Sequence, residues 1–81
     1  MYYVYIIKNE SGRFYIGMTS NIVERLRHHN SGANRSTKNK GPWKIVYSEE
    51  FEDKKSAFFR ERKIKSYKGG DAFKKLIGEI A

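Results

Sequence analysis

The fold is decided by two stretches near the start of the sequence, Tyr2–Lys8 (YYVYIIK) and Arg13–Thr19 (RFYIGMT). Both are rich in β-branched and aromatic residues, which favour β-strands. The interval between them, Asn9–Gly12 (NESG), consists of residues that are typical of turns. The pattern therefore predicts two strands joined as a β-hairpin.

A helix is predicted directly after the hairpin. Asn21 is a good N-cap residue, and Glu24 follows it three positions later, as in a capping box. The segment Asn30-Ser31-Gly32 should end the helix. The apolar face that should pack against the sheet consists of Ile22, Val23 and Leu26.

A third strand is predicted after a long surface loop. Residues 31–42 (SGANRSTKNKGP) are polar, basic and rich in Gly and Ser, as expected of such a loop. The segment Trp43–Phe51 then alternates between two faces, which indicates a strand. One face of this strand should carry Trp43, Ile45 and Tyr47.

Two further helices complete the predicted order of elements. Asp53 can cap a helix that runs to about Tyr67 and is stopped by Gly69-Gly70. Asp71 can cap a short last helix. Residues 1–81 are therefore expected to form one α+β domain, with a three-stranded antiparallel sheet flanked by helices in the order β-β-α-β-α-α.

Length and composition exclude several classes of protein. With 81 residues, the sequence has room for one compact domain. It contains no cysteine, so neither a disulfide framework nor a thiolate metal cluster is possible. The longest uncharged apolar run, Tyr2–Ile7, is too short to cross a bilayer and lacks the features of a signal peptide. We therefore expect a cytoplasmic protein that does not associate with membranes.

The charge predicts an anionic partner. The formal net charge is +8, from 17 Lys and Arg against 9 Asp and Glu. The excess lies in residues 35–48, which hold no acid, and in residues 54–68, which hold only one. Nucleic acid, and DNA in particular, is the expected partner. The basic residues that we assign to DNA binding are Arg27, Arg35, Lys38, Lys40 and Lys65.

Glu61 is the single acid within residues 54–68, and its position is unusual. On a helical wheel it falls in the middle of the apolar stripe of the predicted helix. A carboxylate directed at a core is costly unless a positive group meets it. Two interpretations stay open: a structural salt bridge to Arg25, Arg60 or Lys65, or a metal-binding or catalytic carboxylate at the edge of a cleft.

Two other groups of residues have chemistry suited to phosphate. Arg25 and His29 are i,i+4 neighbours on the first helix, where an arginine can clamp a phosphate and a histidine can move a proton near neutral pH. The simpler alternative is a solvated basic edge of an ordinary helix. Tyr5 and Tyr15 can come close across the hairpin, although aromatic residues in small sheets are more often core residues than catalytic ones.

These residues together resemble the signature of the GIY-YIG nucleases. Tyr3-Val4-Tyr5 and Tyr15-Ile16-Gly17 are similar to the two motifs of that family, with nine residues between Tyr5 and Tyr15. Further along, Arg25, His29 and Glu61 match its catalytic arginine, a histidine of many members and its metal-binding glutamate. The resemblance spans essentially the whole chain, in order.

The sequence differs from the family's first motif at one position and retains the glycine of the second motif. Tyr3 stands where the first motif has glycine, so that "GIY" reads YVY. Gly17, the structural glycine of the second motif, is retained.

The resemblance also implies a mechanism. One divalent ion, Mg²⁺ or Mn²⁺, would be bound by Glu61. Tyr5, helped by His29, would take a proton from the attacking water. Arg25 would stabilise the charged phosphorane, and Tyr15 would hold a phosphate or a water molecule.

We therefore predict a metal-dependent endonuclease that hydrolyses DNA with weak or structure-based selectivity, with a role in DNA repair or recombination. The alternative is a non-catalytic nucleic-acid-binding module with a vestigial nuclease site, and a third, weaker interpretation is an RNA- or ribosome-associated protein. A monomer is the expected state, and a protein partner that supplies specificity is left open.

Overall fold

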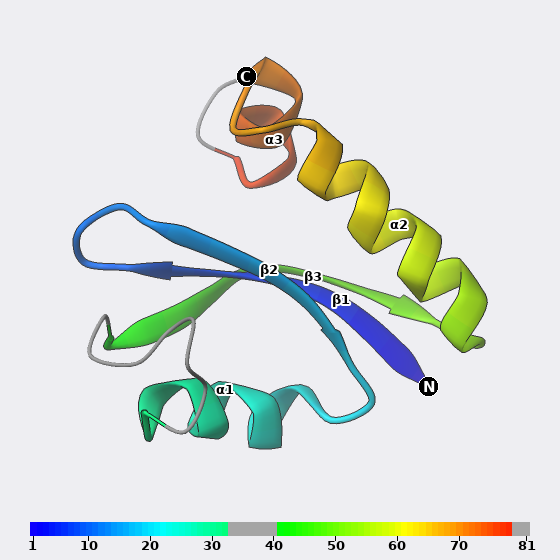
Figure 1. Cartoon of the computed structure of the whole chain (residues 1–81), viewed down its shortest axis with the longest axis horizontal. Coiled ribbons are helices and arrows are strands. Elements are labelled where there is room, and N and C mark those ends of the chain that lie inside the picture. The colour runs from blue at the N-terminus through cyan, green and yellow to red at the C-terminus, as the bar shows by residue number, and fades with distance from the viewer. Residues whose placement is uncertain (33–40, 79–81) are drawn as a thin grey trace.

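The computed structural model describes residues 1–32 and 41–78, and its elements follow the predicted order β-β-α-β-α-α (Figure 1). The strands and helices are β1 (Tyr2–Asn9), β2 (Phe14–Thr19), α1 (Ile22–Asn30), β3 (Trp43–Phe51), α2 (Lys54–Ser66) and α3 (Asp71–Leu76). The α+β class and the three-stranded antiparallel sheet are confirmed. Within the described residues, no helix is long and apolar enough to span a bilayer.

The sheet has the order β2-β1-β3, so β1 is central and β2 is an edge strand. The helices cover it from both sides: α1 lies against one face, and α2 and α3 lie against the other (Figure 1). We call these the α1 face and the α2 face. Successive residues of β1 point to opposite faces, so this buried strand supplies both cores.

The two cores differ in composition. On the α2 face, the buried residues are all apolar, and they are Val4, Ile6, Ala57, Ile64 and Phe73. On the α1 face, the buried cluster contains Tyr5, Ile7 and Trp43, with Leu26 of α1 packed against it. His29 of α1 is also buried between the helix and the sheet.

A β-bulge in β3 changes which side chains share a face. Ile6 lies opposite Tyr47, but Ile7 lies opposite Ile45, so Val46 is an extra residue in β3. Ile45 therefore packs on the α1 face, whereas Tyr47 packs on the α2 face. The prediction that Tyr47 shares a face with Trp43 and Ile45 is wrong, because a one-residue shift reverses the alternation.

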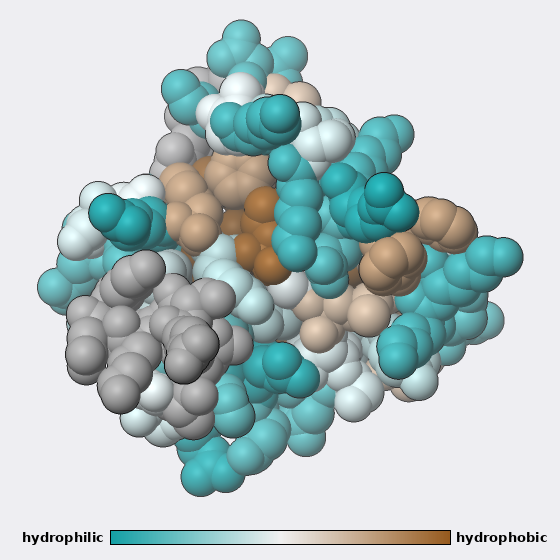
Figure 2. Space-filling model, in the orientation of Figure 1, coloured by the Kyte–Doolittle hydropathy of each residue, from teal (hydrophilic) through white to brown (hydrophobic). Residues whose placement is uncertain are grey.

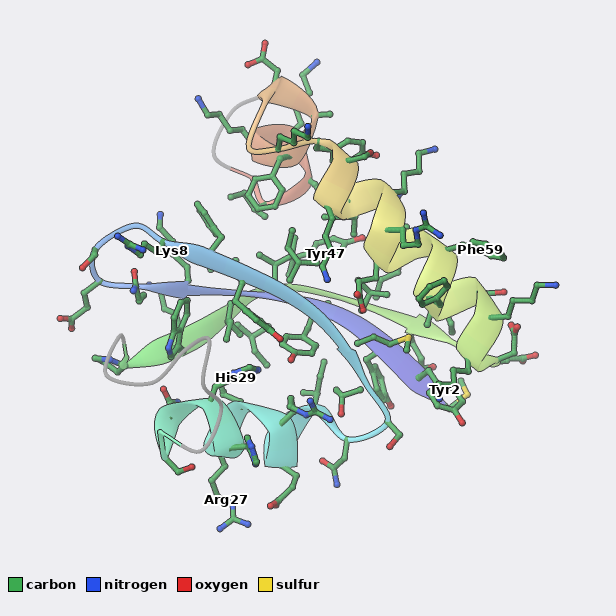
Figure 3. The ribbon with its side chains drawn as sticks, viewed as in Figure 1. Tyr2, Lys8, Arg27, His29, Tyr47 and Phe59 are labelled. Carbon is green, nitrogen blue, oxygen red and sulfur yellow. The ribbon has the colours of Figure 1, made fainter. Side chains whose placement is uncertain are left out.

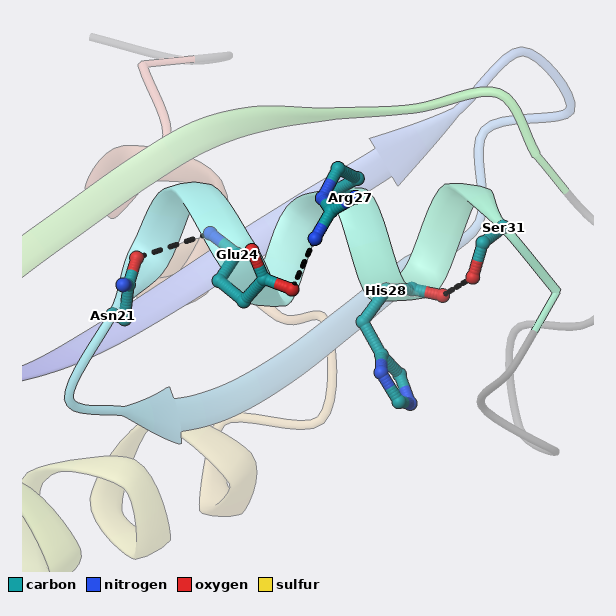
Figure 4. A network of polar contacts seen from close by, with 5 residues as sticks. All are labelled: Asn21, Glu24, Arg27, His28 and Ser31. Atoms are coloured by element: carbon teal, nitrogen blue, oxygen red, sulfur yellow. Dashed lines mark hydrogen bonds and ion pairs between the residues drawn. The ribbon is translucent and has the colours of Figure 1, made fainter.

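The start of α1 follows the prediction in part. The side chain of Asn21 accepts a hydrogen bond from the backbone N–H of Glu24 at 3.0 Å (Figure 4). The carboxylate of Glu24, however, contacts Arg27 instead of returning to Asn21, so the capping box is only half formed. Val23 is 77% exposed, which corrects its assignment to the apolar face. The buried side of α1 is centred on His29, and Val23 lies about 120° away from it around the helix.

The other helix termini can be compared with the prediction in the same way. Asp53 caps α2 by accepting from the backbone N–H of Ser56 at 3.2 Å, as predicted. The N-cap of α3 is Gly70, with no side-chain cap, and Asp71 is the first helical residue. The prediction of Asp71 as the cap was therefore one position too late.

One hydrogen-bonded contact fixes the far end of α1 against β3. The side-chain amide of Asn30 accepts from the backbone N–H of Trp43 at 2.7 Å and donates to its carbonyl at 3.2 Å. This pair of bonds holds the last turn of α1, and with it His29, in a fixed position against the sheet.

Candidate active site

Three of the predicted site residues come from three elements and meet on the α1 face. Tyr5 of β1, Tyr15 of β2 and His29 of α1 have ring centroids between 4.7 and 6.4 Å apart. The hydroxyl of Tyr5 and Nε2 of His29 are 2.8 Å apart and form a buried hydrogen bond. Figure 3 shows His29 directed from α1 towards the sheet. The predicted proximity of Tyr5 and Tyr15 across the hairpin is what the structure shows.

Gly17 allows this arrangement because it lies directly opposite Tyr5 in the hairpin. A Cβ atom on Gly17 would lie 2.5 Å from the Tyr5 hydroxyl oxygen and 2.7 Å from its Cζ. Side-chain atoms do not approach so closely, so any larger residue would displace the tyrosine. The glycine therefore lets the Tyr5 ring lie across the edge strand β2.

His29 is only 1% exposed, and its environment favours the neutral ring. Burial lowers the pKa of His29, and the positive charge of Arg25 and then the nearby His28 lower it further. A neutral imidazole carries one nitrogen that can accept a hydrogen bond. With the ring proton on Nδ1, Nε2 of His29 can receive the proton of the Tyr5 hydroxyl.

The hydroxyl of Tyr5 is held in its protonated form. Burial raises the pKa of Tyr5 well above its ordinary value, and Tyr15 and Glu61 also raise it, whereas Arg25 lowers it. Arg25 and Glu61 thus both act on this hydroxyl, although their helices cover opposite faces of the sheet. They can do so because the Tyr5 ring extends over the edge strand, where the two faces meet.

Arg25 lies on the exposed flank of α1, beside the end of β2. It lines a hollow of about 330 Å³ with Thr19 and Asn21, and a second of about 240 Å³ with Met18 and Lys54. Within the described parts of the chain, Arg25 forms no ion pair. Its guanidinium is thus available to an anionic ligand at the open edge of the sheet.

Glu61 of α2 has a side chain that is 16% exposed and pairs with Lys65. Its Oε1 accepts from the Lys65 ammonium at 2.9 Å. Arg60, another predicted partner of Glu61, binds Glu49 instead, at 3.0 Å. Glu49 also accepts a hydrogen bond from the hydroxyl of Tyr47. Because Lys65 is half exposed and one turn away on the same helix, this pair contributes little to stability.

The donor set at Glu61 fits a hard divalent ion. Among the described residues there is no group of three or more His, Cys, Asp or Glu that could hold a metal ion. Mg²⁺, however, keeps most of its water and is commonly held by one or two carboxylates together with substrate phosphates. In the part of the chain that the structure describes, Oε2 of Glu61 has no hydrogen-bond partner, so one carboxylate oxygen is available.

Not every residue assigned to DNA binding lies at this site. Arg27 points away from the sheet, where it contacts Glu24 on the outer side of α1 (Figures 3 and 4). Lys65 is beside Glu61. The remaining three, Arg35, Lys38 and Lys40, lie outside the described residues.

The structure adds Lys54 to the residues at the site, and it shows where Tyr3 of the first motif lies. Lys54, the first residue of α2, lines the same hollow as Arg25. Tyr3, which replaces the motif glycine, has its pKa raised by a hydrogen bond to Glu50 of β3. The Tyr3 hydroxyl is therefore held towards β3, whereas Gly17 lies in β2, on the other edge of β1. Neither placement is visible in local sequence, because each depends on which strands and helices become neighbours.

A larger hollow, of about 340 Å³, lies near the turn of the hairpin. It is lined by Lys8, Asn9, Glu10, Pro42, Trp43 and Lys44. None of the predicted site residues borders it, so its size alone does not make it the candidate site.

Comparison with known proteins gives one family model and several similar chains. Residues 1–74 match the family model of the GIY-YIG catalytic domain. A UPF0213 protein of Clostridium perfringens is 44% identical over 66 residues, which cover 80% of this chain and 71% of that relative. A UPF0213 protein of Staphylococcus haemolyticus is 39% identical over 67 residues, which cover 82% of each chain. The solution NMR structure of a UPF0213 protein from Bacillus halodurans is 30% identical and covers 90% of this chain and 92% of that one, with a TM-score of 0.49.

Proposed function

This chain belongs to the GIY-YIG nuclease family, and on that basis we propose that it is a metal-dependent endonuclease that hydrolyses phosphodiester bonds in DNA. The observation that carries the proposal is the buried 2.8 Å hydrogen bond between Tyr5 and His29. A purely structural core would gain more from apolar side chains at these two positions.

The Tyr5–His29 pair can move a proton without forming a free phenolate. The raised pKa of Tyr5 keeps its hydroxyl protonated, and the lowered pKa of His29 keeps the imidazole able to accept. As the Tyr5 oxygen takes a proton from the attacking water, its own proton passes to His29 Nε2. The pair therefore acts as a general base even though the pKa of the tyrosine is unfavourable for one.

The remaining residues are suited to bind and stabilise the phosphate. The Arg25 guanidinium would contact the phosphoryl oxygens where negative charge develops, which is usually a large catalytic effect. Tyr15, next to His29, would hold a phosphate oxygen or the attacking water. Glu61 would hold the Mg²⁺ or Mn²⁺ ion through its available oxygen. When bound, such an ion supplies Lewis-acid stabilisation of the phosphoryl group.

The proposal extends to the setting in which the enzyme acts. We propose that residues 1–81 form one nuclease domain that binds DNA in the cytoplasm, as a monomer, and contributes to repair or recombination. Its net charge of +8 supports an affinity for nucleic acid.

One contact favours the alternative, a nucleic-acid-binding module with a vestigial nuclease site. The Lys65 ammonium occupies Oε1 of the proposed metal ligand. If that pair persists on DNA, Glu61 is a structural residue and the protein binds without cleaving.

A cleavage panel separates the two functions. Labelled duplex, single-stranded, flap and branched DNA, with RNA equivalents, are incubated with Mg²⁺ or Mn²⁺ and either the wild-type protein or Glu61→Gln. We expect metal-dependent cleavage of DNA by the wild type, reduced more than about 1000-fold in Glu61→Gln, with equal or tighter DNA binding because a negative charge is removed. Binding without cleavage by the wild type would favour the vestigial site, and undiminished cleavage by Glu61→Gln would refute the metal-ligand assignment.

A further inference from the structure

Two phenylalanines of α2 are exposed outside both cores. Phe58 is 44% exposed and Phe59 is 56% exposed, and their ring centroids are 6.0 Å apart. Figure 2 shows hydrophobic side chains over α2 set among hydrophilic ones. Neither residue belongs to the two buried clusters or to the partly buried residues packed against them, so both rings are open to a ligand.

The two rings differ in their position relative to Glu61. Phe58 precedes Glu61 by three residues, so the two side chains are neighbours on the surface of α2. Phe59 lies about 160° from Glu61 around the helix, on its far side. Of the two exposed aromatic residues, only Phe58 is therefore placed beside the proposed active site.

Positive charge surrounds Phe58. The Arg62 guanidinium lies over its ring, 5.7 Å from the centroid. Lys54 and Lys65 fall on the same side of α2, and Lys54 also lines the hollow that contains Arg25. In the described length of α2, Glu61 is the only acidic residue.

We propose that Phe58 stacks on an unpaired base next to the phosphate that is cleaved, so that the preferred substrates carry a single-stranded segment at the site. This inference rests on the proposed nuclease function. A nucleotide offers both groups that this surface is suited to bind: a π-face for Phe58, and phosphates for Lys54 and Arg62. In an intact duplex the base faces are stacked on one another, so an unpaired base is the form that can reach the ring.

The charges around Phe58 disfavour a protein partner on the same surface. A protein that covered the ring would have to remove Lys54, Lys65 and Arg62 from water, and lysine is depleted in the centre of protein interfaces. Phosphates would instead neutralise these residues and release counterions. The surface is therefore better suited to a nucleic acid than to a second copy of this chain.

Binding is tested without divalent metal, so that cleavage does not interfere. A strand with 2-aminopurine in an unpaired segment is titrated with wild type, Phe58→Ala, Phe58→Trp and the matched control Phe59→Ala. Stacking on Phe58 should quench the fluorescence, and Phe58→Ala should abolish the quench and weaken binding about 5- to 100-fold. The wild type, Phe59→Ala and Phe58→Trp should all show the quench and bind the strand with similar affinity.

The outcomes separate this inference from the nuclease proposal. Equal quenching and affinity for Phe58→Ala and Phe59→Ala would overturn the stacking role, whether or not the protein cleaves DNA. A quench that is lost in Phe58→Ala but kept in Phe59→Ala would support stacking. If the wild type then cleaves no substrate with Mg²⁺, only the nuclease proposal fails. A self-association seen by sedimentation that Phe58→Ala abolishes would assign the ring to a contact between copies and overturn the proposal.

Discussion

The two faces of the sheet are built on different principles, although the same strand supplies both. Towards α2, β1 contributes Val4 and Ile6 to an entirely apolar core. Towards α1, it contributes Tyr5, whose hydroxyl is buried in a hydrogen bond to His29. A buried polar pair stabilises a fold less than apolar packing of similar volume, because the desolvation of its polar atoms must be compensated.

This difference indicates a division of labour. On the function proposed above, we expect the apolar α2 face to contribute more to stability than the α1 face, where the Tyr5–His29 hydrogen bond would serve proton transfer. Substitutions on the two faces should therefore separate activity from stability.

After the loss expected for Glu61→Gln, the next largest effect concerns two arginines of the same helix. Arg25→Ala should reduce cleavage by about 100- to 1000-fold, because the guanidinium at the open edge of the sheet is lost from the developing phosphorane. Arg27→Ala should change cleavage by less than about threefold, since Arg27 contacts Glu24 on the outer side of α1. Steady-state cleavage rates of the two variants test the assignment, and equal losses would contradict the role of Arg25 as the arginine that stabilises the phosphorane.

Gly17→Ala should be the next most damaging change. The new methyl group would displace Tyr5 from its position across β2, and a misplacement of about 1 Å costs about 100-fold in rate. Overpacking should also lower the free energy of unfolding by about 1–3 kcal/mol. Urea denaturation and cleavage assays measure the two effects. A variant with wild-type activity and stability would show that the close contact is not required.

Acidification should have a smaller effect on both the free energy of unfolding and the cleavage rate. The pKa of His29 is lower in the folded protein than in the unfolded chain, so the unfolded chain binds more protons as the pH falls. The contribution of His29 to stability is therefore complete above about pH 6.5 and is lost as the pH falls towards the folded-state pKa. Cleavage should fall over the same range, because the protonated ring cannot accept from Tyr5.

Urea unfolding between pH 7.5 and 5 tests this linkage. The stability of His29→Gln should depend less on pH than that of the wild type, and the exposed His28→Gln serves as the control. If both variants match the wild-type profile, His29 is not the titrating group.

The sequence predicted the positions of the strands and helices better than it predicted which of their side chains face the core. The strands, α1 and α2 follow from local propensity, turn residues and caps such as Asn21 and Asp53. The bulge at Val46 and the exposure of Val23 were missed, because both depend on which element packs against which. The alternation of one strand, taken alone, does not show where an extra residue shifts its pairing with the neighbouring strand.

The candidate site was predicted with similar limits. The spacing of Tyr5 and Tyr15 placed them together, and the structure brings His29 to them. The sequence could not predict that Lys65 is the partner of Glu61. Arg25 and Arg60 were equally possible, because the pairing depends on how the two helices lie against the sheet. The sequence also could not explain why position 17 needs glycine. The structure shows that the Tyr5 ring lies over this residue and leaves no room for a Cβ atom.

The most direct test of the account compares two adjacent residues of β1, Tyr5→Phe on the α1 face and Ile6→Val on the α2 face, in paired cleavage and urea-unfolding measurements. Tyr5→Phe should reduce cleavage about 100-fold or more while changing the free energy of unfolding by less than about 1.5 kcal/mol. Ile6→Val should lower the free energy of unfolding by about 0.5–1.5 kcal/mol while leaving cleavage by the folded protein within about twofold of wild type. Full cleavage activity in Tyr5→Phe would contradict the proton relay and, with it, the division of labour between the two faces.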